Sequence, residues 1–170
     1  MGILNFVKPD KIVLQKATEF EAIFEFRPLE PGYGVTIGNS LRRVLLNSLE
    51  GYAIIGINIA GADHEFATLK GITEDVTEII LNLKQVRIKK KVEHDASVEK
   101  VTLSIKNKTE FTAGMIGEAS PTFEVMNPEL LICTMDSSAK LDIEITIGKG
   151  RGYVPAEENK EKNNHFGYIA

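Results

Sequence analysis

Alternation of apolar and polar residues along the chain predicts that most of it is β-structure. Between Glu19 and Leu29 an aromatic or small apolar residue falls on every second position, which is typical of a half-buried strand. Pro28 ends this strand, because proline cannot donate a hydrogen bond to a sheet. The same kind of pattern predicts further strands over residues 53–60, 86–92, 98–106, 123–125, 130–135 and 141–147.

Two segments follow the helical period instead. One runs from about Thr36 to Glu50, with Gly51 placed as its C-terminal stop. The other runs from Glu74 to about Leu83, with Thr73 as the expected N-cap. Together with the strands, these helices indicate the α+β class: a strand-rich chain with two short helices.

The helix over residues 36–50 carries the most informative pattern. At 100° per residue, one continuous apolar stripe is formed by Ile37, Leu41, Val44, Leu45 and Leu49. The opposite, more polar side holds Asn39, Arg42, Arg43 and Leu46. Because the apolar arc covers more than half of the circumference, we expect this helix to pack against two partners.

The adjacent arginines Arg42 and Arg43 have two explanations. They can form a solvated pair on an outer face, since an unpaired buried guanidinium is costly. Alternatively, they belong to an interface, where arginine is enriched because it pairs bidentately and keeps its charge. The position of Leu46 on the same side favours the interface.

The end of the chain has a different composition. The segment from Ala156 to Asn164 has no apolar residue after the alanine, so we expect a solvated, mobile loop near residues 156–165. From His165 to Ala170 the chain becomes apolar again, as at the start of another element. Its 170 residues leave room for one or two small domains.

Composition and charge narrow the class of function. A formal net charge of -4 makes the chain a poor match to duplex DNA, so no direct DNA contact is expected. No apolar run approaches the roughly 18 residues of a membrane span. The single cysteine, Cys133, excludes a disulfide framework and a Cys-rich zinc site. We therefore expect a cytoplasmic protein that does not contact a membrane.

A basic, glycine-rich segment from Gly148 to Gly152 suggests nucleotide chemistry. A phosphate-binding loop needs amides at a helix N-terminus and a Ser or Thr after its lysine, whereas a glycine follows Lys149. A turn whose backbone approaches another segment is therefore favoured. A small nucleotide-binding enzyme that uses residues 148–152 remains the alternative.

Three other groups favour structural explanations. The histidines, at positions 64, 94 and 165, lack metal-ligand spacing, so no metal site is expected. Cys133 lies in an apolar run, where cysteine acts as a small hydrophobe. The basic cluster over residues 87–91 is typical of a strand edge kept soluble by lysines. A nucleic-acid module built on Lys89 to Lys91 is the weaker reading, since no aromatic residues are interleaved to stack bases.

Four motifs resemble one family. The segment from Leu29 to Leu46, LEPGYGVTIGNSLRRVLL, looks like the signature segment of the bacterial RNA polymerase α subunit, N-terminal domain. Three further matches follow in the family's order: residues 64–66 (HEF), the helix from Glu74 through Lys84, and residues 150–156 (GRGYVPA). The first and last motifs are specific, and together the matches span nearly the whole chain.

The resemblance implies a non-catalytic scaffold with no cofactor. Residues 1–50 would form the first half of a dimerisation part, and residues 51–170 a strand-rich inserted part. In this family two α copies pair, and the dimer is the platform on which the β and β′ subunits assemble for DNA-templated transcription. Nucleotidyl transfer belongs to those large subunits.

The resemblance also implies roles for particular positions. The positions expected to contact the β subunit or to serve assembly are Asn39, Arg42, Arg43, Leu46, His64, Glu65, Lys70 and Lys84. The dimer or core face would be Ile37, Leu41, Val44, Leu45 and Leu49. The residues expected to face the large subunits in the final motif are Arg151, Gly152 and Tyr153.

The chain departs from the family pattern beyond the last motif. Nothing in it matches the long second helix that completes the dimerisation part, or the linker and DNA-binding C-terminal domain. We therefore expect a truncated chain that is wholly or partly monomeric by itself, or that dimerises through a compensating contact.

Overall fold

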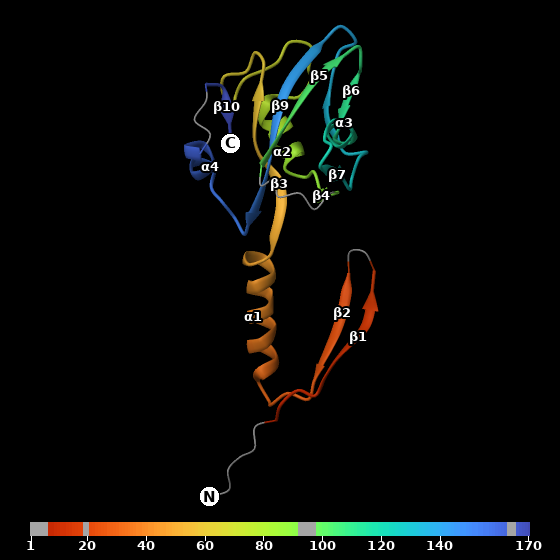
Figure 1. The fold of residues 1–170 in the computed structure, drawn as a ribbon, viewed down its shortest axis with the longest axis vertical. Helices are drawn as coiled ribbons and strands as arrows, with labels where there is room; N and C mark the ends of the chain where they lie inside the picture. The colour runs from red at the N-terminus through yellow and green to blue at the C-terminus, as the bar shows by residue number, and fades with distance from the viewer. Residues whose placement is uncertain (1–6, 19–20, 92–97, 163–165) are drawn as a thin grey trace, which may run out of the picture. The chain divides into compact units, whose positions relative to one another are not determined.

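The computed structural model describes residues 7–18, 21–91, 98–162 and 166–170, and the chain divides into two compact units, residues 1–49 and 50–170. Figure 1 follows the elements along the chain. The α+β class is confirmed, since strands dominate and the described residues contain four helices. Two of these helices were not predicted from the sequence.

The first unit consists of a hairpin and a helix. Its elements are β1 (Lys11–Ala17), β2 (Ala22–Arg27) and α1 (Tyr33–Asn47). The two strands pair antiparallel from Lys11 opposite Arg27, with an irregularity between Leu14 and Lys16. The strand predicted over residues 19–29 corresponds to β2 and stops before Pro28 as expected, whereas positions 19–20 lie outside the described residues.

The bounds of α1 differ from those expected. It begins at Tyr33, directly after Gly32, which has a positive φ of 87° that glycine adopts without strain. It ends at Asn47, where the Ser48 amide donates to the Val44 carbonyl at 2.8 Å. Gly51 is therefore not the helix stop, because strand pairing has already begun at Glu50.

The second unit is built on a six-stranded sheet. The strand order is β5-β9-β3-β4-β7, with β10 paired to β3. Its strands are β3 (Glu50–Ile59), β4 (Ile88–Lys90), β5 (Val98–Lys106), β7 (Phe123–Val125), β9 (Lys140–Arg151) and β10 (Tyr168–Ile169). A separate two-stranded sheet contains β6 (Glu110–Thr112) and β8 (Leu131–Thr134). All described pairs are antiparallel.

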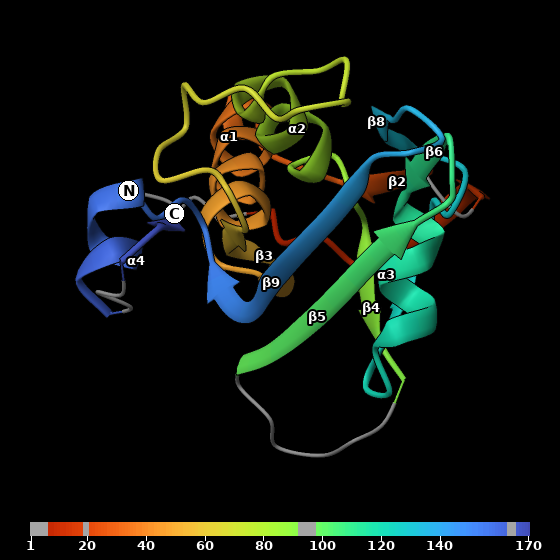
Figure 2. The same cartoon turned by 90° about the horizontal axis from the view of Figure 1, so that it is seen from above.

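Every second residue of β9 enters the core, as the alternation predicts. The buried positions are Leu141, Ile143, Ile145 and Ile147. Three helices belong to this unit: α2 (Val76–Leu83), α3 (Ala113–Ala119) and α4 (Ala156–Lys162). The apolar face of α2, with Val76, Ile79 and Leu83, is buried and packs near β8. Figure 2 shows α3 beside β5.

Local hydrogen bonds explain where α2 begins. Asp75, not Thr73, is the N-cap: its carboxylate accepts from the Glu78 amide at 2.7 Å. In return the Glu78 carboxylate accepts from the Asp75 amide at 3.2 Å, which completes a capping box. The sequence holds this D-x-x-E spacing from Asp75 to Glu78, so the true cap could have been recognised two residues after Thr73.

The expected mobile loop near residues 156–165 is wrong in its first half, because residues 156–162 form α4. Alanine, glutamate and lysine favour helix, and Glu157 and Glu158 lie in the first turn, where the helix dipole favours acids. Residues 163–165 lie outside the described residues. The apolar end of the chain does begin an element, β10.

Helix α3 was missed because it contains Gly114 and Gly117, which disfavour helix by propensity. Tertiary packing is tight at both glycines. A Cβ on Gly114 would lie 3.2 Å from Pro128, and one on Gly117 would lie 3.3 Å from Val125. The glycines therefore allow α3 to lie close against its neighbours.

Candidate subunit interfaces

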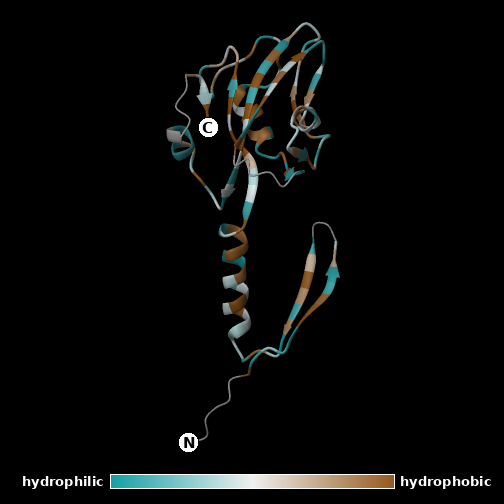
Figure 3. Ribbon diagram, viewed as in Figure 1, coloured by the Kyte–Doolittle hydropathy of each residue, from teal (hydrophilic) through white to brown (hydrophobic). Residues whose placement is uncertain are grey.

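Helix α1 has no buried residue, although it carries a continuous apolar stripe. The exposed fractions of its apolar side chains are 56% for Leu41, 50% for Val44, 62% for Leu45 and 60% for Leu46. Figure 3 shows these hydrophobic stretches along α1 and along the β1–β2 hairpin. Ile37 is half-buried. Leu49, assigned to the same stripe, lies beyond the end of α1 and is 59% exposed.

The polar side of α1 is exposed as well. Asn39, Arg42 and Arg43 are all solvent-accessible. Within the described part of the chain, neither arginine forms a salt bridge or a side-chain hydrogen bond. Both guanidinium groups are thus available for a carboxylate on another molecule.

In the second unit the structure brings together several positions that are distant in sequence. His64 and Glu65 lie in the turn after β3, and Lys84 lies at the C-terminal end of α2. The turn is tied to α2, because the Thr77 hydroxyl donates to the Glu65 carbonyl at 2.8 Å. All three residues border one open hollow of about 420 Å³, together with α4 and β10.

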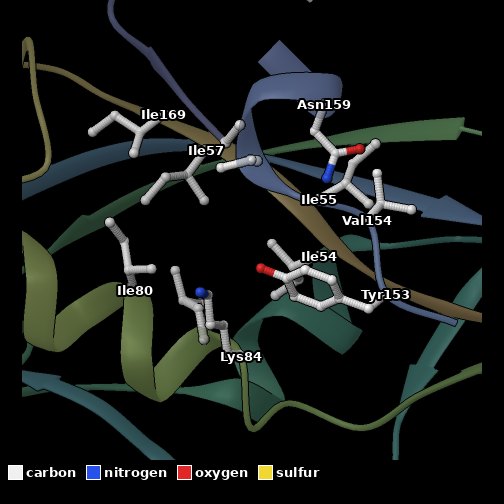
Figure 4. A pocket seen from close by; sticks show the side chains of 13 residues that line it. Ile54, Ile55, Ile57, Ile80, Lys84, Tyr153, Val154, Asn159 and Ile169 are labelled. Atoms are coloured by element: carbon white, nitrogen blue, oxygen red, sulfur yellow. The ribbon is translucent and has the colours of Figure 1, made fainter. Parts of the chain in front are cut away.

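A second pocket, of about 250 Å³, adjoins the first and shares Ile80 and Lys84 with it. Its walls are mainly isoleucines from β3, with Val154 and Ile169. Figure 4 shows Tyr153 beside Lys84 on one side of this pocket, and Asn159 of α4 on the other. Among the described residues, Lys84 is the one charged side chain that lines it.

The glycine-rich segment from Gly148 to Gly152 does not form a phosphate-binding loop. Residues 148–151 belong to β9, and Gly148 faces Ala53 of β3 on one side and Val98 of β5 on the other. The expected turn is therefore wrong, but the expected close approach is confirmed: a Cβ on Gly148 would lie 2.7 Å from Ile55. The nucleotide-binding alternative is not supported, because these amides face strands and not the end of a helix.

The three residues expected to face the large subunits follow one another at the end of β9. Arg151 is exposed opposite Glu50, and Gly152 has a positive φ of 68°. This turn carries the chain away from the sheet and leaves Tyr153 88% exposed at the pocket. Lys70 is also exposed, but it lies in the turn before Gly71 and lines neither pocket.

The basic cluster over residues 87–91 was expected at a strand edge, and this is wrong. Strand β4 pairs with both β3 and β7, so it lies inside the sheet. The Lys90 ammonium lies 5.7 Å from the centre of the Tyr52 ring, within cation–π range. The strand was predicted over residues 86–92, and residue 92 lies outside the described residues.

Cys133 is buried, as its apolar surroundings predict. Burial raises the pKa of its thiol to about 12, with a smaller contribution from the negative charge of Glu74. A thiol with this pKa is not a nucleophile at neutral pH. In the described ranges, no three His, Cys, Asp or Glu residues are grouped as a metal site would require, and no helix could span a membrane.

Sequence reasoning missed the contribution of α4 and of Ile80. Asn159 and Lys160 border the two pockets only because residues 156–162 are helical. Ile80 lies on α2, where it is half-buried and lines both pockets. The composition of α4 carried a helix signal, whereas nothing local indicated that Ile80 would remain accessible.

Comparison with known proteins shows the family. Residues 57–170 match the family model of the RNA polymerase Rpb3/RpoA insert domain. The chain therefore belongs to this family, and the resemblance drawn from the four motifs is confirmed.

Particular relatives carry one common name. The DNA-directed RNA polymerase subunit alpha of Cytophaga hutchinsonii is 57% identical over 169 residues, which cover 99% of this chain and 51% of the relative. The corresponding subunit of Bacteroides fragilis is 59% identical over 161 residues, 95% of this chain and 48% of the relative. The chain thus spans about half the length of the curated relatives it matches.

Proposed function

We propose that this chain is a non-catalytic assembly module of a DNA-directed RNA polymerase, a nucleotidyltransferase complex. In this role residues 1–50 supply half of a dimerisation part, and residues 51–170 form the inserted part. The chain would pair with a second α copy and carry the β and β′ subunits in DNA-templated transcription. A cytoplasmic location and no direct DNA contact follow from this role.

One observation carries the proposal: α1 exposes an apolar stripe and a separate arginine-bearing side, and it buries no residue. Exposed contiguous apolar surface of this kind marks an interaction site. Two distinct faces allow two partners. We assign the stripe of Ile37, Leu41, Val44 and Leu45 to the second α copy, and Leu49, which follows the helix, to the same contact.

We assign the other side of α1 to the β subunit, through Asn39, Arg42, Arg43 and Leu46. Arginine suits such a surface because its guanidinium binds carboxylates bidentately. The hollow bordered by His64, Glu65 and Lys84 would add a second contact, with Lys70 beyond it. Arg151, Gly152 and Tyr153 would face the large subunits, whose division between β and β′ we leave open.

The test is co-purification with the β subunit. We expect Arg43→Ala to reduce the amount of β recovered by about tenfold, since hydrogen bonds to charged groups contribute roughly 1.5–3 kcal/mol. Arg27→Ala is the control, because Arg27 is also an exposed arginine of the first unit but lies outside α1. Unchanged recovery with Arg43→Ala would contradict the assignment of this side to β.

A further inference from the structure

Strand β5 ends the six-stranded sheet, and no other described strand covers its outer edge. Among the described residues it pairs with β9 alone, over all nine positions from Val98 to Lys106. An edge of this length presents unpaired amides and carbonyls, which form a template for another extended segment.

A groove runs beside the second half of this edge. It lies between β5 and α3, has a volume of about 330 Å³, and is lined on the strand side by residues 103–106. Its helix side is formed by Met115, Glu118 and Ala119. At the other end of the strand, outside the groove, the Ser120 hydroxyl just after α3 donates to the Glu99 carboxylate at 2.7 Å, which ties the end of α3 to β5.

The packing of α3 explains why the groove is apolar within. Gly114 and Gly117 lie against Pro128 and Val125, which turns Met115 toward β5. On the strand, Ile105 is buried and Leu103 is half-buried on the inner face. Apolar side chains of an added strand would enter between these residues and Met115.

The outer face of β5 has the opposite character. Its exposed residues include two lysines, Lys100 and Lys106, and no acid, and Lys108 follows at the mouth of the groove. Lys100 already pairs with Glu144 at 2.8 Å. Lys108 has no ion pair within the described part of the chain. Positive charge on an edge disfavours pairing with a second copy and favours an acidic strand.

From these observations we propose that residues 103–106 of β5 bind an extended peptide segment in which apolar and acidic residues alternate. The segment adds to the sheet by backbone hydrogen bonds. Its apolar side chains enter the groove beside α3, and its carboxylates lie near Lys106 and Lys108. None of the residues of this site is among those assigned to assembly, and the proposal does not depend on that role.

Fluorescence anisotropy with the full chain tests the proposal. The probe is a fluorescein-labelled peptide of four Val-Glu repeats at nanomolar concentration. One matched peptide has four Val-Lys repeats, and another has proline at alternate valines. We expect the Val-Glu peptide to bind at least about tenfold more tightly than either, because one loses charge complementarity and the other loses backbone donors.

Variants of the chain locate the site. Lys106→Glu combined with Lys108→Glu should weaken binding of the Val-Glu peptide about tenfold, whereas Glu118→Gln should strengthen it slightly. Arg87→Glu combined with Lys89→Glu changes the net charge equally at a distant strand and should leave binding unchanged. Bound peptide should also slow hydrogen exchange of the amides in residues 103–106.

Four results would overturn the proposal. They are no binding of the Val-Glu peptide at millimolar chain, equal binding of the Val-Lys or proline peptide, and binding insensitive to the Lys106 and Lys108 changes. The fourth is self-association of the chain that the same lysine changes alter, since a second copy would then occupy the edge.

Discussion

Residues 50–170 enclose a core of their own, whereas the described part of residues 1–49 encloses none. All the residues of the buried hydrophobic cluster belong to the second unit. The first unit carries comparable apolar residues, but it leaves Phe24 63% and Leu45 62% exposed. A difference in packing, not in hydrophobic content, therefore separates the two units.

The physical reason is the number of layers each unit supplies. In the second unit, α2 packs near β8, and α3 packs against β5 and β7, so apolar faces meet within the chain. The first unit has a two-stranded hairpin and one helix, and two strands by themselves are marginally stable. Fully burying a leucine contributes about 1.5–3 kcal/mol, which α1 can gain only from another surface.

The largest expected effect is a loss of stability when a buried phenylalanine is replaced, compared with an exposed one. Phe111 is 0% exposed in the second unit and Phe24 is 63% exposed in the first. We expect Phe111→Ala to lower the free energy of unfolding by about 3–5 kcal/mol, because it leaves a cavity. Phe24→Ala should change it by less than about 0.5 kcal/mol. Urea unfolding followed by circular dichroism measures the stability of both variants. Similar losses of stability would contradict the difference in packing between the two units.

The next effect concerns the helix starts. Helix α2 has a reciprocal capping box, whereas α1 starts without a side-chain cap. We expect Asp75→Ala to reduce stability by about 1 kcal/mol, since it leaves helix amides unpaired. Thr73→Ala, at the cap expected from the sequence, is the control and should have a smaller effect. Equal effects in urea titrations would mean that the box contributes little.

The smallest expected effect is the contribution of two surface ion pairs to the stability of the second unit. Hydrogen bonds from Lys140 and Ser104 lower the pKa of Asp142, and the Lys149 ammonium lowers that of Glu50. A lowered folded-state pKa gives stability that is present above the unfolded value and is lost as pH falls through the folded value. The urea midpoint should therefore fall slightly below about pH 4, near the unfolded carboxyl values.

A double variant, Lys140→Met with Lys149→Met, provides the control for this pH effect. It removes both cations and should show a smaller drop in the urea midpoint between pH 6 and pH 3. An unchanged drop would mean that other carboxylates account for the acid sensitivity. Both ion pairs are exposed, so a modest effect is expected.

The sequence predicted those elements whose pattern was local and strong. Strand β5 was placed residue for residue, and the buried alternation of β9 was recognised because every second position is apolar. The end of the first helix was misplaced, since residue 50 is taken by pairing with β9, a contact about a hundred residues away. Helix α3 was missed because its glycines serve packing that the local sequence does not reveal.

The candidate surfaces divide in the same way. The two faces of α1 follow from residue spacing alone, because the helical period fixes which side chains share a side. The meeting of His64 and Lys84 at one hollow, with α4 beside it, required the fold. So did the groove beside β5, since nothing near residue 103 in the sequence indicates that Met115 lies opposite.

By itself, the sequence determined the family, the strand-rich class and which side chains share each face of the first helix. Periodicity and motif spacing are properties of neighbouring residues, so they can be recognised without a structure. Only the tertiary structure decided that residues 50–170 complete a core while α1 stays uncovered. Burial depends on which distant segments meet, and only folding brings those segments together.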